Sequence, residues 1–137
     1  MVVLQIEDNA SNAALVEQVL ARRSAVRLVT SPEGRAGLAL ARDHRPDLIL
    51  LDLHLPDIPG EELLHRLRAI PELGNAKVVV VSADATPSRI RRMLELGVEG
   101  YLTKPVDVEA LLRLVDLEIA GAQVRGEPVG PSYPKPS

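Results

Sequence analysis

Strand-like and helix-like patterns alternate five times along the chain, and this order constrains the fold more than any other feature of the sequence. The strand-like segments are short apolar runs, and between them apolar residues recur every three or four positions. Strands joined in this way run parallel and are covered by helices on both faces, so the sequence predicts a doubly wound α/β fold. The predicted strands are residues 2–6, 26–30, 48–51, 78–81 and 101–103.

The predicted helices begin and end at residues that are typical of helix termini. Ser31 and Thr86 each precede a proline and are expected to cap the second and fourth helices, and Asp107 is expected to cap the fifth. Gly97 lies where the end of the fourth helix favours a left-handed residue. The residues expected to face the core are Ala36, Ala39 and Leu40 in the second helix, and Ile90, Met93 and Leu94 in the fourth.

Length and composition narrow the classes of function. At 137 residues, 46% of them hydrophobic, the chain is long enough for one domain with its own core. The absence of Cys excludes disulfides, thiolate zinc sites and Cys nucleophiles, and the three His show no metal-ligand spacing. A net charge of -3 argues against direct binding to nucleic acid. The apolar runs are too short to span a membrane and no export signal is visible, so we expect a cytoplasmic protein.

Polar residues follow four of the predicted strands, and the carboxyl ends of parallel strands meet at one edge of a sheet. Three carboxylates close together repel one another, which favours a divalent cation such as Mg²⁺ with its preference for oxygen ligands. With Mg²⁺ present, Lys104 neutralising one phosphoryl oxygen and Ser82 hydrogen-bonded to another, Asp52 can act as a nucleophile toward phosphorus. The sequence therefore predicts a phosphoryl-acceptor site built from Glu7, Asp8, Asp52, Ser82 and Lys104.

Each of these residues also has an ordinary structural explanation. Asp52 can cap the turn after its strand, and Glu7 and Asp8 can be solvated charges at a helix N-terminus. Lys104, which precedes a proline, can simply end a strand. These explanations would have to coincide at one edge of one sheet, which favours the chemical interpretation. Asp57 lies between two prolines in the loop after the third strand and is interpreted as a turn former without a role at the metal.

Four sequence motifs connect the chain to a known family. They are IEDN at residues 6–9, PDLILLDLHLP at residues 46–56 followed by Gly60, VVVVSAD at residues 78–84 and GYLTKP at residues 100–105. Over residues 2 to about 119 the chain resembles the receiver domain of bacterial two-component response regulators. The resemblance implies a flavodoxin-like (βα)5 three-layer sandwich, with a parallel five-stranded sheet in the order 2-1-3-4-5.

The resemblance also implies a role for each site residue. Asp52 is then the phosphoacceptor and Lys104 the partner of the phosphoryl group. Ser82 is the switch hydroxyl, Tyr101 is the aromatic side chain that changes rotamer, and the peptide bond after Lys104 is expected to be cis. The metal, Mg²⁺ (or Mn²⁺), is expected to be held by the carboxylates of Glu7, Asp8 and Asp52 and by the main-chain carbonyl of His54.

The implied function is signalling, with at most self-phosphotransfer and self-dephosphorylation as enzymatic activity. A phosphohistidine of a sensor histidine kinase or a histidine phosphotransfer protein donates the phosphoryl group to Asp52, and Ser82 and Tyr101 then rearrange. The face formed by the fourth helix, fifth strand and fifth helix would bind a downstream effector protein, or a second copy as a phosphorylation-dependent homodimer. The basic run at residues 88–92 is either an edge for a partner or a solvated helix face.

Three residues at or beside the site affect what the resemblance implies. Glu7 stands where the family most often has Asp, so its longer side chain is expected to reach the metal differently. His54 and Asp84 each lie two residues after a site residue and flank the path of hydrolytic water. At these positions an imidazole and a carboxylate either orient that water or block it.

Two functions from other classes remain as alternatives. A Mg²⁺-dependent phosphohydrolase of the haloacid dehalogenase type also uses an Asp nucleophile, but it usually places a second Asp two residues later and on the first strand. Here His54 occupies that position, after the third predicted strand. A degenerate receiver that only binds proteins is the other alternative, and the complete acidic cluster with Lys104 argues against it.

The C-terminal region differs in composition from the rest of the chain. Residues 1–120 are expected to form the receiver domain, and the Pro- and Gly-rich residues 121–137 a disordered tail or linker. A receiver without an output domain would be a stand-alone shuttle or part of a longer chain, such as the C-terminal receiver of a hybrid histidine kinase. The Glu-Asp-Asn sequence at residues 7–9 is similar to that of hybrid-kinase receivers.

Overall fold

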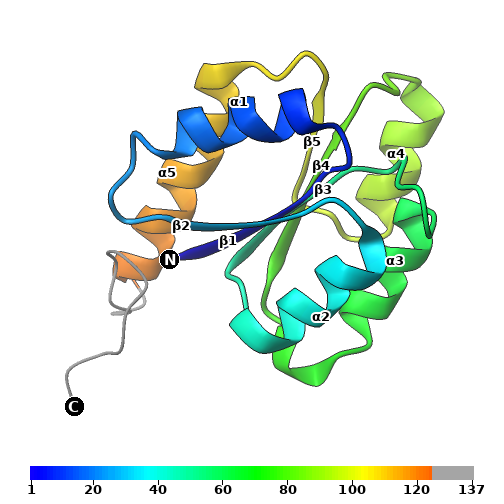
Figure 1. Ribbon diagram of the computed structural model, residues 1–137, viewed down its shortest axis with the longest axis horizontal. Coiled ribbons are helices and arrows are strands. Elements are labelled where there is room, and N and C mark those ends of the chain that lie inside the picture. The colour runs from blue at the N-terminus through cyan, green and yellow to red at the C-terminus, as the bar shows by residue number, and fades with distance from the viewer. Residues whose placement is uncertain (125–137) are drawn as a thin grey trace.

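Five parallel strands form the central sheet, in the order β2-β1-β3-β4-β5 (Figure 1). The computed structural model describes residues 1–124. The strand order confirms the predicted flavodoxin-like (βα)5 sandwich. The elements are β1 (Val2–Ile6), α1 (Ala10–Leu20), β2 (Arg27–Ser31), α2 (Gly34–His44), β3 (Leu48–Leu51), α3 (Gly60–Arg68), the 3-10 helix η1 (Pro71–Leu73), β4 (Lys77–Ser82), α4 (Pro87–Glu95), β5 (Gly100–Thr103) and α5 (Val108–Val124).

Helices cover both faces of the sheet, with α1 and α5 on one side and α2, α3 and α4 on the other (Figure 1). Successive residues of a strand point to opposite faces, so the apolar strands supply two separate cores. The core under α2, α3 and α4 takes Leu4, Ile6, Ile49, Leu51, Val78 and Val80 from the sheet, and the core under α1 and α5 takes Val3, Leu48, Leu50, Val79 and Val81.

The central strand β3 determines where the residue after it emerges. All four of its residues are buried, and it pairs in parallel with β1 on one side and β4 on the other. The register sets Leu51 opposite Ile6, and the backbone N–H of Asp52 continues the ladder by donating to the carbonyl of Ile6 at 3.1 Å. Asp52 therefore lies beside the end of β1.

The second helix buries a different face from the one predicted. Ser31 ends β2 and does not cap the helix, which starts at Gly34 with Glu33 as its N-cap. A Cβ at Gly37 would lie 2.7 Å from Cδ1 of Ile6, so the glycine lets the helix approach the sheet closely. The prediction that Ala36 and Ala39 face the core was therefore wrong: the buried residues are Gly34, Gly37, Leu38 and Ala41.

The fourth helix is held to the core by few side chains. Thr86 occupies its N-cap position as predicted, although its side chain makes no capping hydrogen bond, and Gly97, with φ 95°, follows its end as predicted. Met93 is fully buried, but Leu94 is 47% exposed, so the prediction that Leu94 faces inward was wrong. Consecutive helical residues are rotated by about 100°, so Leu94 points away from the sheet once Met93 fills the space against it.

The last helix is longer than expected. Asp107 caps it as predicted, accepting hydrogen bonds from the N–H groups of Glu109 at 2.9 Å and Ala110 at 3.1 Å. The helix runs to Val124, four residues past the predicted domain end at residue 120. The rest of the predicted tail, residues 125–137, lies outside the described residues. Within the described part of the chain, no helix is both long and apolar enough to span a membrane.

Candidate functional site

The predicted acidic residues converge at the carboxyl edge of the sheet. Glu7 and Asp8 follow β1, and Asp52 follows the neighbouring strand β3. One carboxylate oxygen from each of the three lies within 4.8 Å of the others. Glu7 and Asp52 are 6% and 4% exposed, whereas Asp8 is exposed to solvent. We refer to these three residues as the acid cluster.

The acid cluster fits a hard divalent cation. Its donor atoms are carboxylate oxygens, the ligands that Mg²⁺ prefers, and no His or Cys side chain among the described residues joins the group. Two of the three acids are buried, where the repulsion between charges is least screened by water. A cation or a proton is therefore needed to stabilise them together.

Lys104 supplies one positive charge to the acid cluster. Its Nζ lies 2.6 Å from Oε1 of Glu7 and 3.3 Å from Oδ2 of Asp52. Burial lowers the pKa of the Lys104 ammonium, but the hydrogen bonds and charges of Glu7 and Asp52 outweigh burial, so this pKa lies above its ordinary value. Burial raises the pKa of the Glu7 carboxyl even though the hydrogen bond from Lys104 lowers it.

Backbone groups in the adjoining loops hold the two buried acids in place. The N–H of Asn9 donates to Oε2 of Glu7 at 3.2 Å, and the N–H of His54 donates to Oδ1 of Asp52 at 3.1 Å. One carboxylate oxygen of Asp52 thus accepts a backbone hydrogen bond, and the other lies near Lys104. The loop after β3 folds back closely, because a Cβ at Gly60 would lie only 2.5 Å from the Cα of Leu53.

A second group of residues links β4 to β5 beside the acid cluster. Ser82 is fully buried, and its Oγ accepts a hydrogen bond from the N–H of Asp84 at 3.1 Å. The hydroxyl of Tyr101 donates to the main-chain carbonyl of Asp84 at 2.6 Å. The N–H of Lys104 donates to the carbonyl of Ser82 at 2.9 Å, and the expected cis bond to Pro105 is present. Ser82, Asp84 and Tyr101 therefore form one connected unit.

The role of Asp84 in this unit was not predicted from the sequence. Sequence reasoning assigned its side chain to the path of water, but its main-chain carbonyl is what Tyr101 contacts. Hydrogen bonds from Thr86 lower the pKa of the Asp84 carboxyl, which accepts from the N–H of Thr86, the residue before the first turn of α4, at 2.9 Å. A main-chain contact leaves no pattern in the sequence, so no signal was available to find it.

Asp57 was correctly separated from the acid cluster, but its partner was missed. Its carboxylate accepts hydrogen bonds from the N–H groups of Gly34 and Arg35, both at 2.8 Å. These groups are the unpaired donors at the start of α2, so Asp57 caps that helix from another loop. The hydrogen bonds from Arg35 and Gly34 lower the pKa of the Asp57 carboxyl.

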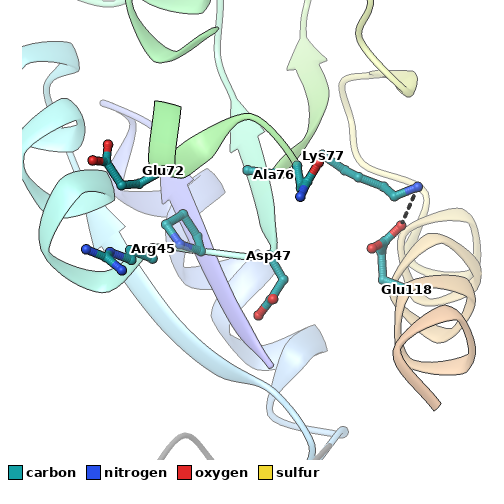
Figure 2. Close-up of a pocket in the computed structure, with 8 residues that line it drawn as sticks. Arg45, Asp47, Glu72, Ala76, Lys77 and Glu118 are labelled. Carbon is teal, nitrogen blue, oxygen red and sulfur yellow. Dashed lines mark ion pairs between the residues drawn. The ribbon is translucent and has the colours of Figure 1, made fainter. Parts of the chain in front are cut away.

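Two cavities lie at opposite edges of the sheet. A groove of about 540 Å³ borders the acid cluster and is lined by Asp8, His54 and Arg89 among others. A second cavity of about 480 Å³ lies at the amino edge, between Asp47, which precedes β3, and Glu118 of α5 (Figure 2). Its charges have both signs: Arg45 and Lys77 line it together with Asp47, Glu72 and Glu118, and Lys77 lies 3.6 Å from Glu118.

Comparison with known proteins identifies the class to which this fold and acid cluster belong. Residues 3–116 match the response regulator receiver domain, and the chain belongs to this family. It is accordingly a phosphoacceptor signalling module of two-component systems.

Individual relatives agree with this family. The polar-differentiation response regulator DivK of Brucella anthropi is 34% identical over 113 residues, which are 82% of this chain and 91% of DivK. The chemotaxis response regulator CheY4 of Vibrio cholerae is similar in structure, with a TM-score of 0.78 and 25% identity, covering 85% of this chain and 97% of that chain. The receiver domain of sensor histidine kinase PA1611 from Pseudomonas aeruginosa, solved with magnesium in its active site cleft, has a TM-score of 0.76 and 27% identity, covering 87% and 97%.

Proposed function

We propose that Asp52 is the residue that accepts the phosphoryl group, and that the donor is a phosphohistidine of a sensor histidine kinase or a histidine phosphotransfer protein. The observation that carries this proposal is the setting of the Asp52 carboxylate, which is 4% exposed and lies between the N–H of His54 and the ammonium of Lys104. These contacts orient the carboxylate next to the residues that line the groove.

In the proposed reaction, a carboxylate oxygen of Asp52 attacks phosphorus, the bond from phosphorus to the donor imidazole nitrogen breaks, and the imidazole takes up a proton. The ammonium of Lys104 is close enough to Asp52 to pair with a phosphoryl oxygen, which spreads the developing charge. The hydroxyl of Ser82 can donate to another phosphoryl oxygen. Hydrolysis of the aspartyl phosphate by water would return the site to its first state, and this self-dephosphorylation is the only turnover that we propose.

We propose Mg²⁺ (or Mn²⁺) as the cation of the acid cluster, held by Glu7, Asp8, Asp52 and the main-chain carbonyl of His54. When bound, such an ion neutralises charge on the phosphoryl oxygens. The all-oxygen donor set supports this assignment, and so does the magnesium in the cleft of the similar PA1611 receiver domain. The side chain of Glu7 is one methylene longer than that of Asp, and its Oε1 pairs with Lys104. This ion pair competes with a bound cation for the carboxylate of Glu7.

The proposed response to phosphorylation runs through the connected unit of Ser82, Asp84 and Tyr101. A hydroxyl of Ser82 that turns toward the phosphoryl group gives up its bond to the N–H of Asp84, and the carbonyl of Asp84 is the acceptor of Tyr101. A local change in charge would thereby alter the packing of α4, β5 and α5. This face would bind an effector protein or a second copy of the chain.

The basic run at residues 88–92 now has partners for two of its arginines. Arg89 and Arg92 both form ion pairs with Glu61 of α3, at 3.4 Å and 2.8 Å. Arg91 takes part in no ion pair among the described residues and is exposed, next to the exposed Leu94 on the same helix. We propose that Arg91 and Leu94, and not the whole basic run, are the contribution of α4 to a partner surface.

A cytoplasmic location is part of the proposed function, because the phosphohistidine donors are phosphorylated by ATP in the cytoplasm.

Phosphate uptake tests the assignment of Asp52. The purified chain incubated with acetyl phosphate and Mg²⁺ should gain one phosphoryl group by intact-mass spectrometry, and Asp52→Asn should gain none. Asp57→Asn is the matched control, because it changes an acid of the same loop that caps α2, and it should still take up phosphate. Phosphate uptake by Asp52→Asn at the wild-type level would show that another residue is the acceptor.

A further inference from the structure

The groove beside the acid cluster contains an arginine to which the proposed function gives no role. Arg89 lies in the first turn of α4, and its side chain is 31% exposed. The same groove is lined by Asp8, the exposed acid of the cluster, and by His54, whose N–H donates to Asp52. Arg89 is thus a cation at the border of the route by which a phosphodonor reaches Asp52.

The charges along that route oppose the approach of an anion. A phosphodonor carries negative charge and must approach three carboxylates. The side chain of Lys104 is only 15% exposed and already pairs with Glu7 and Asp52. Its positive charge is therefore largely neutralised by these two carboxylates before a donor arrives. Among the described residues that line the groove, Arg89 is the sole Arg or Lys, so it is the first cation that a donor meets.

The way in which Arg89 is held leaves it available to another anion. Its Nη1 lies 3.4 Å from Oε2 of Glu61, whereas Arg92 binds the other oxygen of the same carboxylate at 2.8 Å. Glu61 therefore keeps a close cationic partner if Arg89 turns away. The positive charge of Arg89 also acts on a residue of the site. Hydrogen bonds from Thr86 lower the pKa of the Asp84 carboxyl, and the charge of Arg89 lowers it further.

We propose that Arg89 recruits the dianionic phosphoryl group of the phosphodonor at the mouth of the groove, while Glu61 keeps the guanidinium in position when no donor is present. Arg89 is in this view a substrate-positioning residue and makes no bond to phosphorus. The proposal rests on the proposed function, since it presumes transfer to Asp52. It predicts that the chain discriminates between small phosphodonors by their charge.

Two small donors and a matched pair of variants test the proposal. Acetyl phosphate is a dianion near neutral pH, whereas phosphoramidate has a protonated nitrogen and is a net monoanion. Second-order rate constants of phosphorylation are measured with both donors in the presence of Mg²⁺, for wild type, Arg89→Gln, Arg89→Lys and Arg66→Gln. Arg66→Gln is the matched control, because it removes a similarly exposed arginine ion pair, to Glu62, that shares no partner with Arg89 and does not line the groove.

Arg89→Gln should lower the rate constant with acetyl phosphate by about two- to fivefold, the range expected for one partly exposed charge pair. The loss should be smaller with phosphoramidate and should shrink at high salt. Arg89→Lys should recover much of the rate, and Arg66→Gln should resemble wild type. Melting temperatures of the four proteins show whether any change in rate reflects folding.

Equal rates for Arg89→Gln and Arg66→Gln would overturn the proposal, and so would an equal loss with both donors. In either case the wild type would still take up phosphate, so the proposed function would stand. A wild type that takes up phosphate from neither donor would instead overturn the proposed function, and the role of Arg89 with it.

Discussion

The two edges of the sheet use the same kinds of charged residue but differ in burial. At the carboxyl edge, Lys104 lies between Glu7 and Asp52, whose side chains are 5% and 4% exposed. At the amino edge, Lys77 lies 3.6 Å from Glu118 at the side of an open cavity, and its side chain is 41% exposed (Figure 2). Charges interact strongly where water is excluded and weakly where it is not.

The acids of the two edges also have different partners. At the amino edge, Asp47 accepts a hydrogen bond from the N–H of Val2 at 2.9 Å, and Glu99 accepts one from the N–H of Val78 at 2.6 Å. These acids complete backbone hydrogen bonding at the start of strands. At the carboxyl edge the acids face one another, so their charge is left to be balanced by a lysine and a cation. Burial and convergence, more than residue type, make the carboxyl edge a chemical site.

Removing each lysine is the strongest test of this comparison. In metal-free buffer, Lys104→Met should lower the free energy of unfolding by about 3 kcal/mol, because it leaves two buried carboxylates without their cation. Lys77→Met should lower it by less than about 1 kcal/mol, because its ion pair is largely exposed. Urea denaturation of both variants measures the difference. Equal losses in the free energy of unfolding would show that the different burial of the two lysines does not change how much each stabilises the fold.

Glycines at the two edges provide a test of intermediate size. Gly60→Ala should destabilise the protein by about 2 kcal/mol, because the new Cβ would lie 2.5 Å from the backbone of Leu53. Gly74→Ala should change stability by less than about 1 kcal/mol, because its Cβ would lie 3.3 Å from a single atom, the carbonyl oxygen of Pro71. Thermal unfolding compares them, and slower phosphorylation of Gly60→Ala would show that the loop positions Asp52. A Gly60→Ala protein as stable as wild type would contradict the close approach.

The pH dependence of stability is the smallest and most specific test of burial at the carboxyl edge. Burial raises the pKa of Glu7 above 4.5 in the folded protein, so Glu7 favours folding below about pH 4.5. That contribution is lost as the pH rises through the raised pKa. In metal-free buffer, the stability of wild type relative to Glu7→Gln should therefore fall across this range.

Excess Mg²⁺ is the control for the pH test. A bound cation favours the charged carboxylate, so the relative loss of wild-type stability with rising pH should disappear when Mg²⁺ is added. A difference between wild type and Glu7→Gln that does not change with pH would contradict the raised pKa. A slope that persists in excess Mg²⁺ would contradict Glu7 as a metal ligand.

Much of the candidate site could be predicted from the sequence because it depends on the ends of strands. Glu7, Asp52 and Lys104 are each the first residue after a strand, and parallel strands end at the same edge. The predicted inward faces of α2 and α4 were less reliable. Ala36 and Leu94 are apolar and fit a helical repeat, but close approach through Gly37 and filling by Met93 decided which side of each helix is buried.

The sequence by itself determined the order of the elements, the parallel sheet and the residues that gather at its carboxyl edge, because these follow from local periodicity and from chain connectivity. Only the tertiary structure decided that Asp57 caps α2, that Tyr101 reaches the carbonyl of Asp84, and that Arg89 lies beside the groove. Each of these arrangements brings together residues from separate elements or loops of the chain. Their geometry is set by how the layers pack, which no local pattern records.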